Sequence, residues 1–138
     1  MDVLLKKNTN QSITIMIKIG NNLSEWSSYS CQPKTKKELE KIIEERISKD
    51  GISCDLNDID VSLIMDMSYL FYGSKLSEFN GNISEWDVSN VKYMIGMFAY
   101  SNFNQDISNW KINKDCNVNN VFEGCPIEEE LEPKSLQL

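Results

Sequence analysis

Two stretches of the sequence decide how this chain folds, because they share five of their eight residues at the same positions. Residues 79–86 read Phe-Asn-Gly-Asn-Ile-Ser-Glu-Trp, and residues 103–110 read Phe-Asn-Gln-Asp-Ile-Ser-Asn-Trp. Around them, one pattern of apolar spacing occurs three times. The first unit has Leu56, Ile59, Val61, Ile64, Met67, Leu70 and Phe71, the second has Ile83, Trp86, Val88, Val91, Met94, Met97 and Phe98, and the third has Ile107, Trp110, Ile112, Val118, Val121 and Phe122. A repeat of 24–27 residues indicates units that bury their apolar faces by stacking.

The apolar spacing within each unit predicts a strand followed by a helical turn. The opening I-x-x-W-x-V places its last two apolar residues on one face of a strand, and V-x-x-M-x-x-M-F has the spacing of a short helix or 3₁₀ turn. The opening also resembles the strand of a leucine-rich repeat. We therefore predict an α+β fold, a short leucine-rich-repeat-like solenoid of about three turns with an N-terminal strand and a capping helix. Trp86 and Trp110 hold the same place in the pattern, so we expect them side by side in the core.

The N-terminal part, residues 1–53, predicts the elements that close the front of the stack. Isoleucine at every second position of residues 12–19 indicates a half-buried strand. Residues 35–49 predict an amphipathic helix, because Thr35 and Glu38 have the spacing of a capping box. Its apolar stripe consists of Leu39, Ile42, Ile43 and Ile47.

Two further parts follow in the sequence. Residues 54–127 form the repeat region, and residues 128–138 form an acidic tail. The segment 125–127, Cys-Pro-Ile, breaks the apolar pattern with a proline and ends the repeats. We expect the tail to be solvated and partly disordered, because it is rich in glutamate and lies at the end of the chain.

The net charge of −7 is unevenly distributed, with +2 on residues 1–50 and −9 on residues 51–138. The acidic part repels phosphate groups, which argues against direct nucleic-acid binding. No stretch reaches the roughly 20 apolar residues that span a bilayer, and residues 1–7 lack the apolar run of an export signal. We therefore expect a cytoplasmic protein that does not bind membranes. In such a reducing compartment the four cysteines are expected to be free thiols, with a bridge between Cys116 and Cys125 as the alternative.

The residues that catalysis needs are scarce, so we expect that the protein is not an enzyme. The chain has no histidine, which removes Ser-His and Cys-His dyads and the commonest metal ligand. Residues 55–58, Asp-Leu-Asn-Asp, begin like a calcium loop, but no glycine follows at the sixth position. No glycine-rich loop that would hold a phosphate is present. We expect no metal and no cofactor.

Residues 79–98, and more loosely residues 103–122, match a specific repeat motif, F-N-x-D-I-S-x-W-D-V-S-N-V-x-x-M-x-x-M-F. On this motif, residues 54–127 resemble a short variant of the BspA-like leucine-rich repeat family, also seen as mycoplasma-type lipoprotein repeats. The resemblance implies a stacked, β-containing solenoid used for recognition, often on bacterial surfaces. This chain departs from the surface-protein pattern in having few repeats, no export signal and no anchor. In the third unit, Lys111 also replaces the aspartate found at Asp87.

We weigh three functions for such a chain. The leading hypothesis is a non-enzymatic protein-binding module, and its sharpest version is a small acidic inhibitor that occludes a basic site on a larger protein. Anti-defence proteins of phages, including anti-CRISPR proteins, are analogous in size and charge. The alternative is a fragment of a bacterial surface adhesin, and the third is a structural repeat protein with no specific partner.

The candidate binding residues lie between the apolar positions of the predicted strands, where side chains point outward and stacking aligns them. One column consists of Asp58, Glu85 and Asn109, and the next consists of Asp60, Asp87 and Lys111. We call these six residues the polar columns. Four stacked carboxylates repel one another unless something is gained, so we predict that the columns bind a protein with a basic surface.

Overall fold

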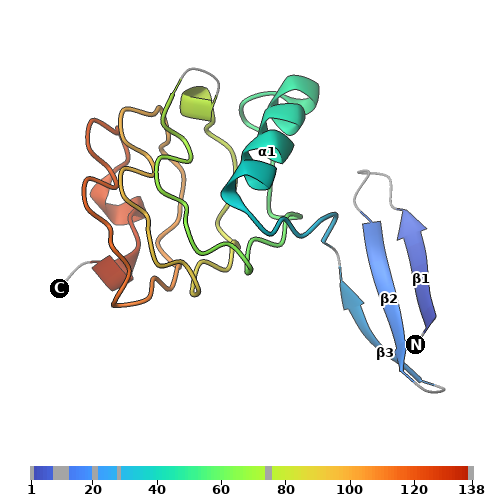
Figure 1. The fold of residues 1–138 in the computed structure, drawn as a ribbon. Coiled ribbons are helices and arrows are strands. Elements are labelled where there is room, and N and C mark those ends of the chain that lie inside the picture. The colour runs from blue at the N-terminus through green and yellow to red at the C-terminus, as the bar shows by residue number, and fades with distance from the viewer. Residues whose placement is uncertain (1, 8–12, 20–21, 28, 74–75, 137–138) are drawn as a thin grey trace.

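The computed structural model describes residues 2–7, 13–19, 22–27, 29–73 and 76–136. Its elements in chain order are β1 (Asp2–Lys7), β2 (Ile13–Ile19), β3 (Asn22–Ser27), α1 (Lys36–Asp50), and the 3₁₀ helices η1 (Leu76–Glu78), η2 (Glu129–Leu131) and η3 (Lys134–Leu136). Figure 1 shows three parts in this order: a small sheet, the helix α1, and a stack of loops that runs to the C-terminus.

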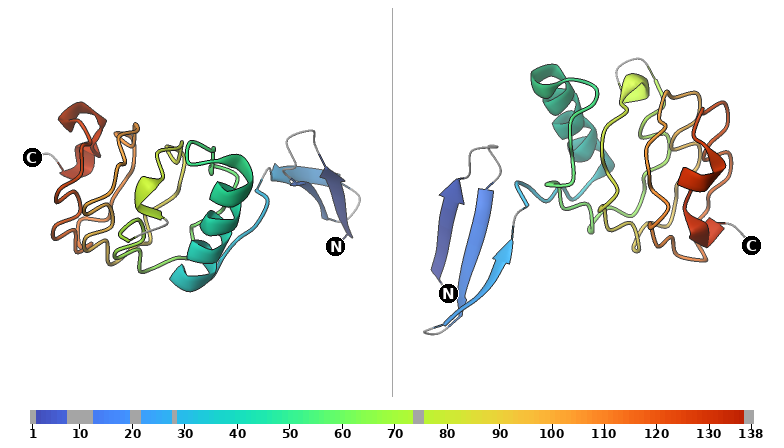
Figure 2. Two further views of the ribbon diagram at one scale, coloured as in Figure 1. Left: turned by 90° about the horizontal axis from the view of Figure 1, so that it is seen from above. Right: turned by 180° about the vertical axis from the view of Figure 1, so that it is seen from behind.

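The N-terminal sheet has three antiparallel strands in the order β1-β2-β3. The isoleucine alternation correctly predicted β2 from Ile13 to Ile19, while residue 12 lies outside the described residues. β2 is the central strand, with Val3 opposite Ile17 on one side and Trp26 opposite Met16 on the other. The sheet stands apart from α1 and from the loop stack, so it does not close the front of the stack as we expected (Figures 1 and 2).

The predicted amphipathic helix forms as α1 and begins at the predicted capping residue. Thr35 Oγ1 accepts a hydrogen bond from the Glu38 backbone N–H at 3.2 Å, and the Glu38 carboxylate accepts one from the Lys34 N–H at 2.9 Å. Leu39 and Ile43 are fully buried in the core that α1 shares with the repeat units. α1 lies across one end of the loop stack (Figure 2), where its apolar face covers the first unit.

The predicted fold class, an α+β leucine-rich-repeat-like solenoid built on strands, is wrong. Within the described part of residues 52–128 there is no strand, and the backbone consists of turns and loops with the short helix η1. Isolated parallel bridges, such as Asp66 with Tyr93 and Tyr93 with Asn117, and further backbone hydrogen bonds connect the units.

Local hydrogen bonds explain why the repeats are loops. The spacing I-x-x-W closes a tight turn, in which the Trp86 N–H donates to the Ile83 carbonyl at 3.2 Å. Asp87 Oδ1 then accepts a hydrogen bond from the Ser89 N–H at 3.1 Å. Asp106, just before the I-x-x-W spacing of the third unit, forms a turn of the same kind with the Ser108 N–H. Short polar side chains that bond the backbone two residues on compete with strand pairing, so these repeats turn where a leucine-rich repeat extends.

Successive units nevertheless stack, and the two predicted tryptophans meet in the core. Trp86 and Trp110 are 4% and 3% exposed, and their ring centroids lie 6.4 Å apart with planes inclined by 9°. Phe71 and Phe98 stack in the same way with centroids 5.2 Å apart. The prediction that both tryptophans are buried side by side is confirmed.

The acidic C-terminal segment is not a solvated tail over residues 128–136. The Leu131 carbonyl accepts a hydrogen bond from the Ile107 N–H at 3.0 Å, and Pro133 is buried. Ser135 Oγ donates to the Trp110 carbonyl at 3.1 Å. These contacts are possible because leucine and proline alternate with the glutamates, and they cover the tryptophan side of the third unit.

The remaining sequence expectations concern cysteines and membranes. All four cysteines are free thiols, as expected, and burial raises the pKa of each one. No helix in the described residues is long and apolar enough to cross a membrane.

Candidate functional site

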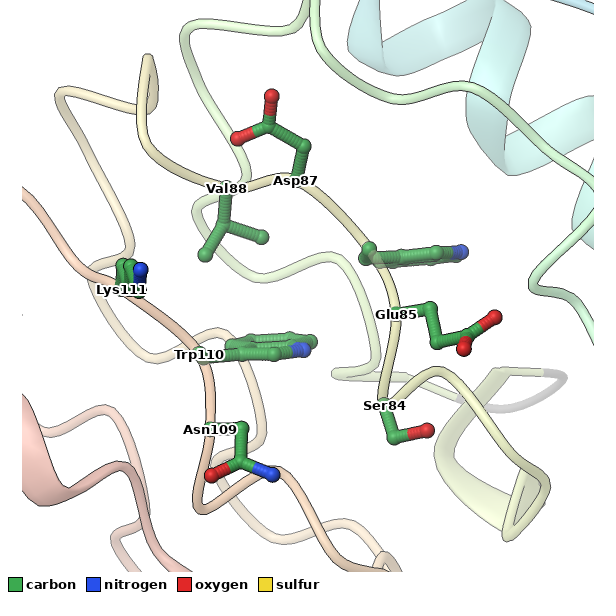
Figure 3. A pocket seen from close by; sticks show the side chains of 8 residues that line it. Ser84, Glu85, Asp87, Val88, Asn109, Trp110 and Lys111 are labelled. Carbon is green, nitrogen blue, oxygen red and sulfur yellow. The ribbon is translucent and has the colours of Figure 1, made fainter.

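A shallow hollow of about 240 Å³ lies between the second and third units, on the side of the stack that carries the polar columns. Its lining consists of Ser84, Glu85, Trp86, Asp87, Val88, Asn109, Trp110 and Lys111. Figure 3 shows Glu85 and Asp87 on one unit and Asn109 and Lys111 on the next. Four of the six predicted site residues therefore line one hollow.

The hollow is positioned by the stacked tryptophans. Trp86 and Trp110 alternate along the chain with the exposed residues, so burying each indole directs its neighbours outward. Each indole N–H is anchored on the unit before it: Trp86 Nε1 donates to the Leu56 carbonyl and Trp110 Nε1 to the Ile83 carbonyl, both at 2.9 Å. The walls of the hollow thus have a rigid base.

Asp58 is a member of the polar columns, but its side chain is largely buried. Its carboxylate oxygens lie 3.0 and 2.8 Å from Nη1 of Arg46, and the Ser30 hydroxyl donates to it at 2.6 Å. The side chain is 14% exposed. Arg46 also donates from Nη2 to the Asp55 carbonyl at 3.0 Å. Asp58 therefore ties α1 to the first unit, which is a structural role.

Asp60 is also engaged by neighbouring residues. Its carboxylate accepts hydrogen bonds from Gln32 Nε2 at 2.8 Å and from the Ser62 N–H at 3.0 Å. Asp87 accepts only within its own turn, from the backbone N–H and hydroxyl of Ser89 at 3.1 and 2.6 Å. In the first unit, the residues of the polar columns therefore bond to neighbouring parts of the fold. In the later units, the column residues face solvent.

The electrostatics of the hollow come from three charged side chains. Glu85 and Asp87 are exposed, and neither forms an ion pair with any residue that the structure describes. Lys111 is exposed on the opposite wall (Figure 3). Two acids and one base leave the hollow with an excess negative charge, which suits a single positively charged side chain better than an anion.

A second exposed surface was missed from the sequence. Tyr69, Tyr72 and Tyr100 are 51%, 52% and 61% exposed. The Tyr72 ring meets the other two edge-on, with centroids 5.8 Å from Tyr69 and 6.3 Å from Tyr100. We call these three residues the tyrosine surface. All three fall outside the apolar pattern of the repeat, and this signal could have marked them as exposed aromatic residues.

Two residues of the tyrosine surface, Tyr69 and Tyr100, each contact the unit that follows their own. Tyr69 has the left-handed φ of 58°, and its ring lies against Gly96 of the next unit, where a Cβ would collide with it. The Tyr100 hydroxyl donates to the Glu123 carboxylate at 2.9 Å, and this hydrogen bond raises the pKa of Tyr100. Tyr69 and Tyr100 are thus each held by a contact with the following unit.

No group of three metal-ligating side chains occurs among the described residues. The fold and the two surfaces define a repeat protein of stacked, loop-built units. The chain belongs to the family described as Mycoplasma protein of unknown function, DUF285, whose model matches residues 38–129, from α1 to η2. No curated protein and no solved structure matched the chain.

Proposed function

We propose that this chain is a non-enzymatic protein-binding module that recognises a partner with a basic surface. The observation that carries the proposal is the hollow between the second and third units, where Glu85 and Asp87 are exposed without an ion pair among the described residues. A lysine or arginine side chain of the partner would enter the hollow and pair with these two carboxylates. The indoles beneath are almost fully buried, so the two carboxylates rather than apolar contacts would hold such a side chain.

The net charge of −7 supports the same kind of partner, because a strongly acidic protein attracts basic surfaces and accelerates the encounter with them. In its sharpest form the proposal is a small acidic inhibitor that covers a basic site on a larger protein, like phage anti-defence proteins of the anti-CRISPR kind. We also propose that the chain is related to BspA-like repeat proteins, because residues 79–98 match the motif of that family.

The tyrosine surface supports a protein as the partner. Tyrosine is enriched at protein interfaces because it offers a large contact area with little conformational freedom to lose. The contacts among Tyr69, Tyr72 and Tyr100 restrict their side chains, which lowers the cost of ordering them on binding.

The experiment compares two double variants with the same change in charge. Glu85→Gln with Asp87→Asn removes both carboxylates from the hollow, and Asp115→Asn with Glu130→Gln removes two exposed carboxylates elsewhere. Partners are captured from lysate with the unaltered chain, and affinity is then measured with one purified partner. We expect the hollow variant to lose about tenfold or more in affinity, the cost of one charge-assisted hydrogen bond, and the control to lose little.

Salt dependence provides the second readout. Binding through the hollow should weaken between about 0.1 and 0.5 M salt, because the Debye length shrinks over this range. Equal affinity of the two double variants would contradict the role of the hollow, and the search would move to the tyrosine surface.

A further inference from the structure

The third unit ends the stack with a row of backbone N–H groups that have no acceptor among the described residues. In the second unit, four alternate N–H groups donate to carbonyls of the third unit: Met94 to Asn117 (2.7 Å), Gly96 to Asn119 (2.9 Å), Phe98 to Val121 (2.9 Å) and Tyr100 to Glu123 (2.7 Å). The equivalent residues of the third unit, 24 positions further on, are Val118, Asn120, Phe122 and Gly124. Within the described ranges, no residue accepts a hydrogen bond from these four N–H groups, which we call the donor row.

The two units follow the same backbone path, so the donor row faces away from the stack. Gly96 and Asn120 have φ of 58° and 57°, and Tyr100 and Gly124 have φ of 55° and 66°. Because the left-handed positions coincide, the N–H groups of the third unit point where a fourth unit would lie. The direction is set by the same turns that close the internal interface.

The C-terminal segment covers a different part of the third unit. Its hydrogen bonds reach Ile107, Ser108, Trp110 and Ile112, on the tryptophan side. The donor row lies on the other side, where the turns of residues 117–124 run. The C-terminal segment therefore caps the tryptophan side of the last unit.

The apolar side chains beside the donor row are incompletely buried. Met94 and Phe98 in the second unit are fully buried, whereas Val118 and Phe122 at the equivalent positions of the third unit are only partly buried. Unpaired donors beside partly exposed core residues form an edge of the kind that pairs with another chain.

We propose that the donor row is a docking edge for a segment of a partner protein. The segment supplies four carbonyls at alternate residues and an apolar side chain that covers Val118 and Phe122. Its path is that of residues 117–123, because these residues satisfy the same donors in the second unit. Asparagine or glycine at the left-handed positions suits this path best.

A second copy of this chain is a poor occupant. The matching carbonyls would be those of its first unit, and there Lys36 Nζ donates to the Ser68 carbonyl at 3.0 Å. α1 also lies across that end of the stack (Figure 2). Head-to-tail stacking of two copies would require displacing the helix, so the proposal commits to a segment of a different protein.

The first measurement is amide hydrogen exchange of the full chain. We expect the N–H groups of Val118, Asn120, Phe122 and Gly124 to exchange about a hundredfold faster than those of Met94, Gly96, Phe98 and Tyr100. Equal protection of the two rows in dilute protein would overturn the proposal, because the edge would then already be closed.

The second measurement adds a synthetic peptide with the sequence of residues 113–126 as the probe. At about 1 mM, a concentration suited to a weak interaction, it should slow exchange of the donor row about tenfold. A control peptide with valine at the positions of Asn120 and Gly124 should have no effect, because branched residues do not adopt left-handed turns. Failure of the first peptide to slow exchange would also overturn the proposal.

A protein variant checks where the peptide binds. Phe122→Lys places a charge on the edge and should abolish the effect of the peptide, whereas Ser48→Lys, at an exposed position of α1, should leave it unchanged. If Phe122→Lys fails to fold, the two peptides still decide the question on the unaltered protein. Protection that rises with protein concentration in the absence of peptide would show pairing with a second copy and overturn the commitment to a different protein.

Discussion

Trp86 and Trp110 occupy equivalent positions in neighbouring units, with parallel rings whose centroids lie 6.4 Å apart. Each indole donates its N–H to a backbone carbonyl of the unit before its own, at 2.9 Å. One residue type therefore fills the core and holds adjacent units together. This pair also forms the base of the hollow that we propose as the binding site.

Replacing Trp110 with alanine should lower the free energy of unfolding by about 3–5 kcal/mol, because it removes a buried ring and leaves a cavity. Replacing it with phenylalanine should cost less, since a ring remains and mainly the hydrogen bond to the Ile83 carbonyl is lost. Urea denaturation measures both values. An alanine variant that loses no more than the phenylalanine variant would contradict the ring's packing role.

Arg46 and Asp58 should contribute to stability as a coupled pair. Asp58→Asn should cost about 1–3 kcal/mol, because the Arg46 guanidinium loses a charged partner at 2.8 Å in a partly buried position. A double-mutant cycle with Arg46→Met isolates the pair from other contacts of either residue. Additive effects of the two substitutions would mean that the contact stabilises nothing. Asp115→Asn, at an exposed position, serves as the control.

Gly96→Ala should be strongly destabilising, for two separable reasons. Its φ of 58° is unfavourable for alanine by about 1–2 kcal/mol, and the added Cβ would collide with the Tyr69 ring. Combining it with Tyr69→Ala removes the collision and leaves the conformational cost. Thermal unfolding should therefore show that Gly96→Ala costs less in the Tyr69→Ala background. An equal cost in both backgrounds would place the ring elsewhere.

Stability should fall at high pH, because burial raises the pKa of Cys54 and Cys125 above the ordinary value of 9.0. Above that value the unfolded chain releases thiol protons that the folded chain keeps, so unfolding becomes easier as pH rises. Urea denaturation between about pH 8 and 10 measures this loss.

The control for the thiol prediction is the double variant Cys54→Ala with Cys125→Ala. It should flatten the decline, because two of the raised pKa values are removed. A decline of the same size in this variant would assign the effect to other groups. Thiol labelling of the native chain at neutral pH should be slow for the same reason, and unfolding in urea should accelerate it.

Prediction from sequence succeeded where a local pattern has one physical solution. The capping box at Thr35 and the stripe through Leu39 and Ile43 specify a helix with one buried face, and α1 has both features. The equal spacing of Trp86 and Trp110 likewise required them to meet once the units stacked. These predictions depended on periodicity alone.

Prediction failed where two local structures share one spacing. The motif I-x-x-W-x-V fits a leucine-rich-repeat strand, but side chains such as Asp87 and Asp106 bond the backbone of the following serine and fold it into turns. Glu85 and Asp87 are exposed, as the alternation of apolar and polar residues predicted. The ion pair between Asp58 and Arg46 could not be predicted, because it depends on how α1 crosses the first unit.

The sequence by itself determined the period of the repeat, the residues that enter the core and the start of α1, because apolar spacing and capping chemistry act over a few residues. Only the tertiary structure decided which carboxylates remain exposed, that tyrosines from two units meet, and that the donor row at Val118 to Gly124 lies open. Each of these features depends on which units are neighbours in the stack. Each also depends on how much of the stack α1 and the C-terminal segment cover.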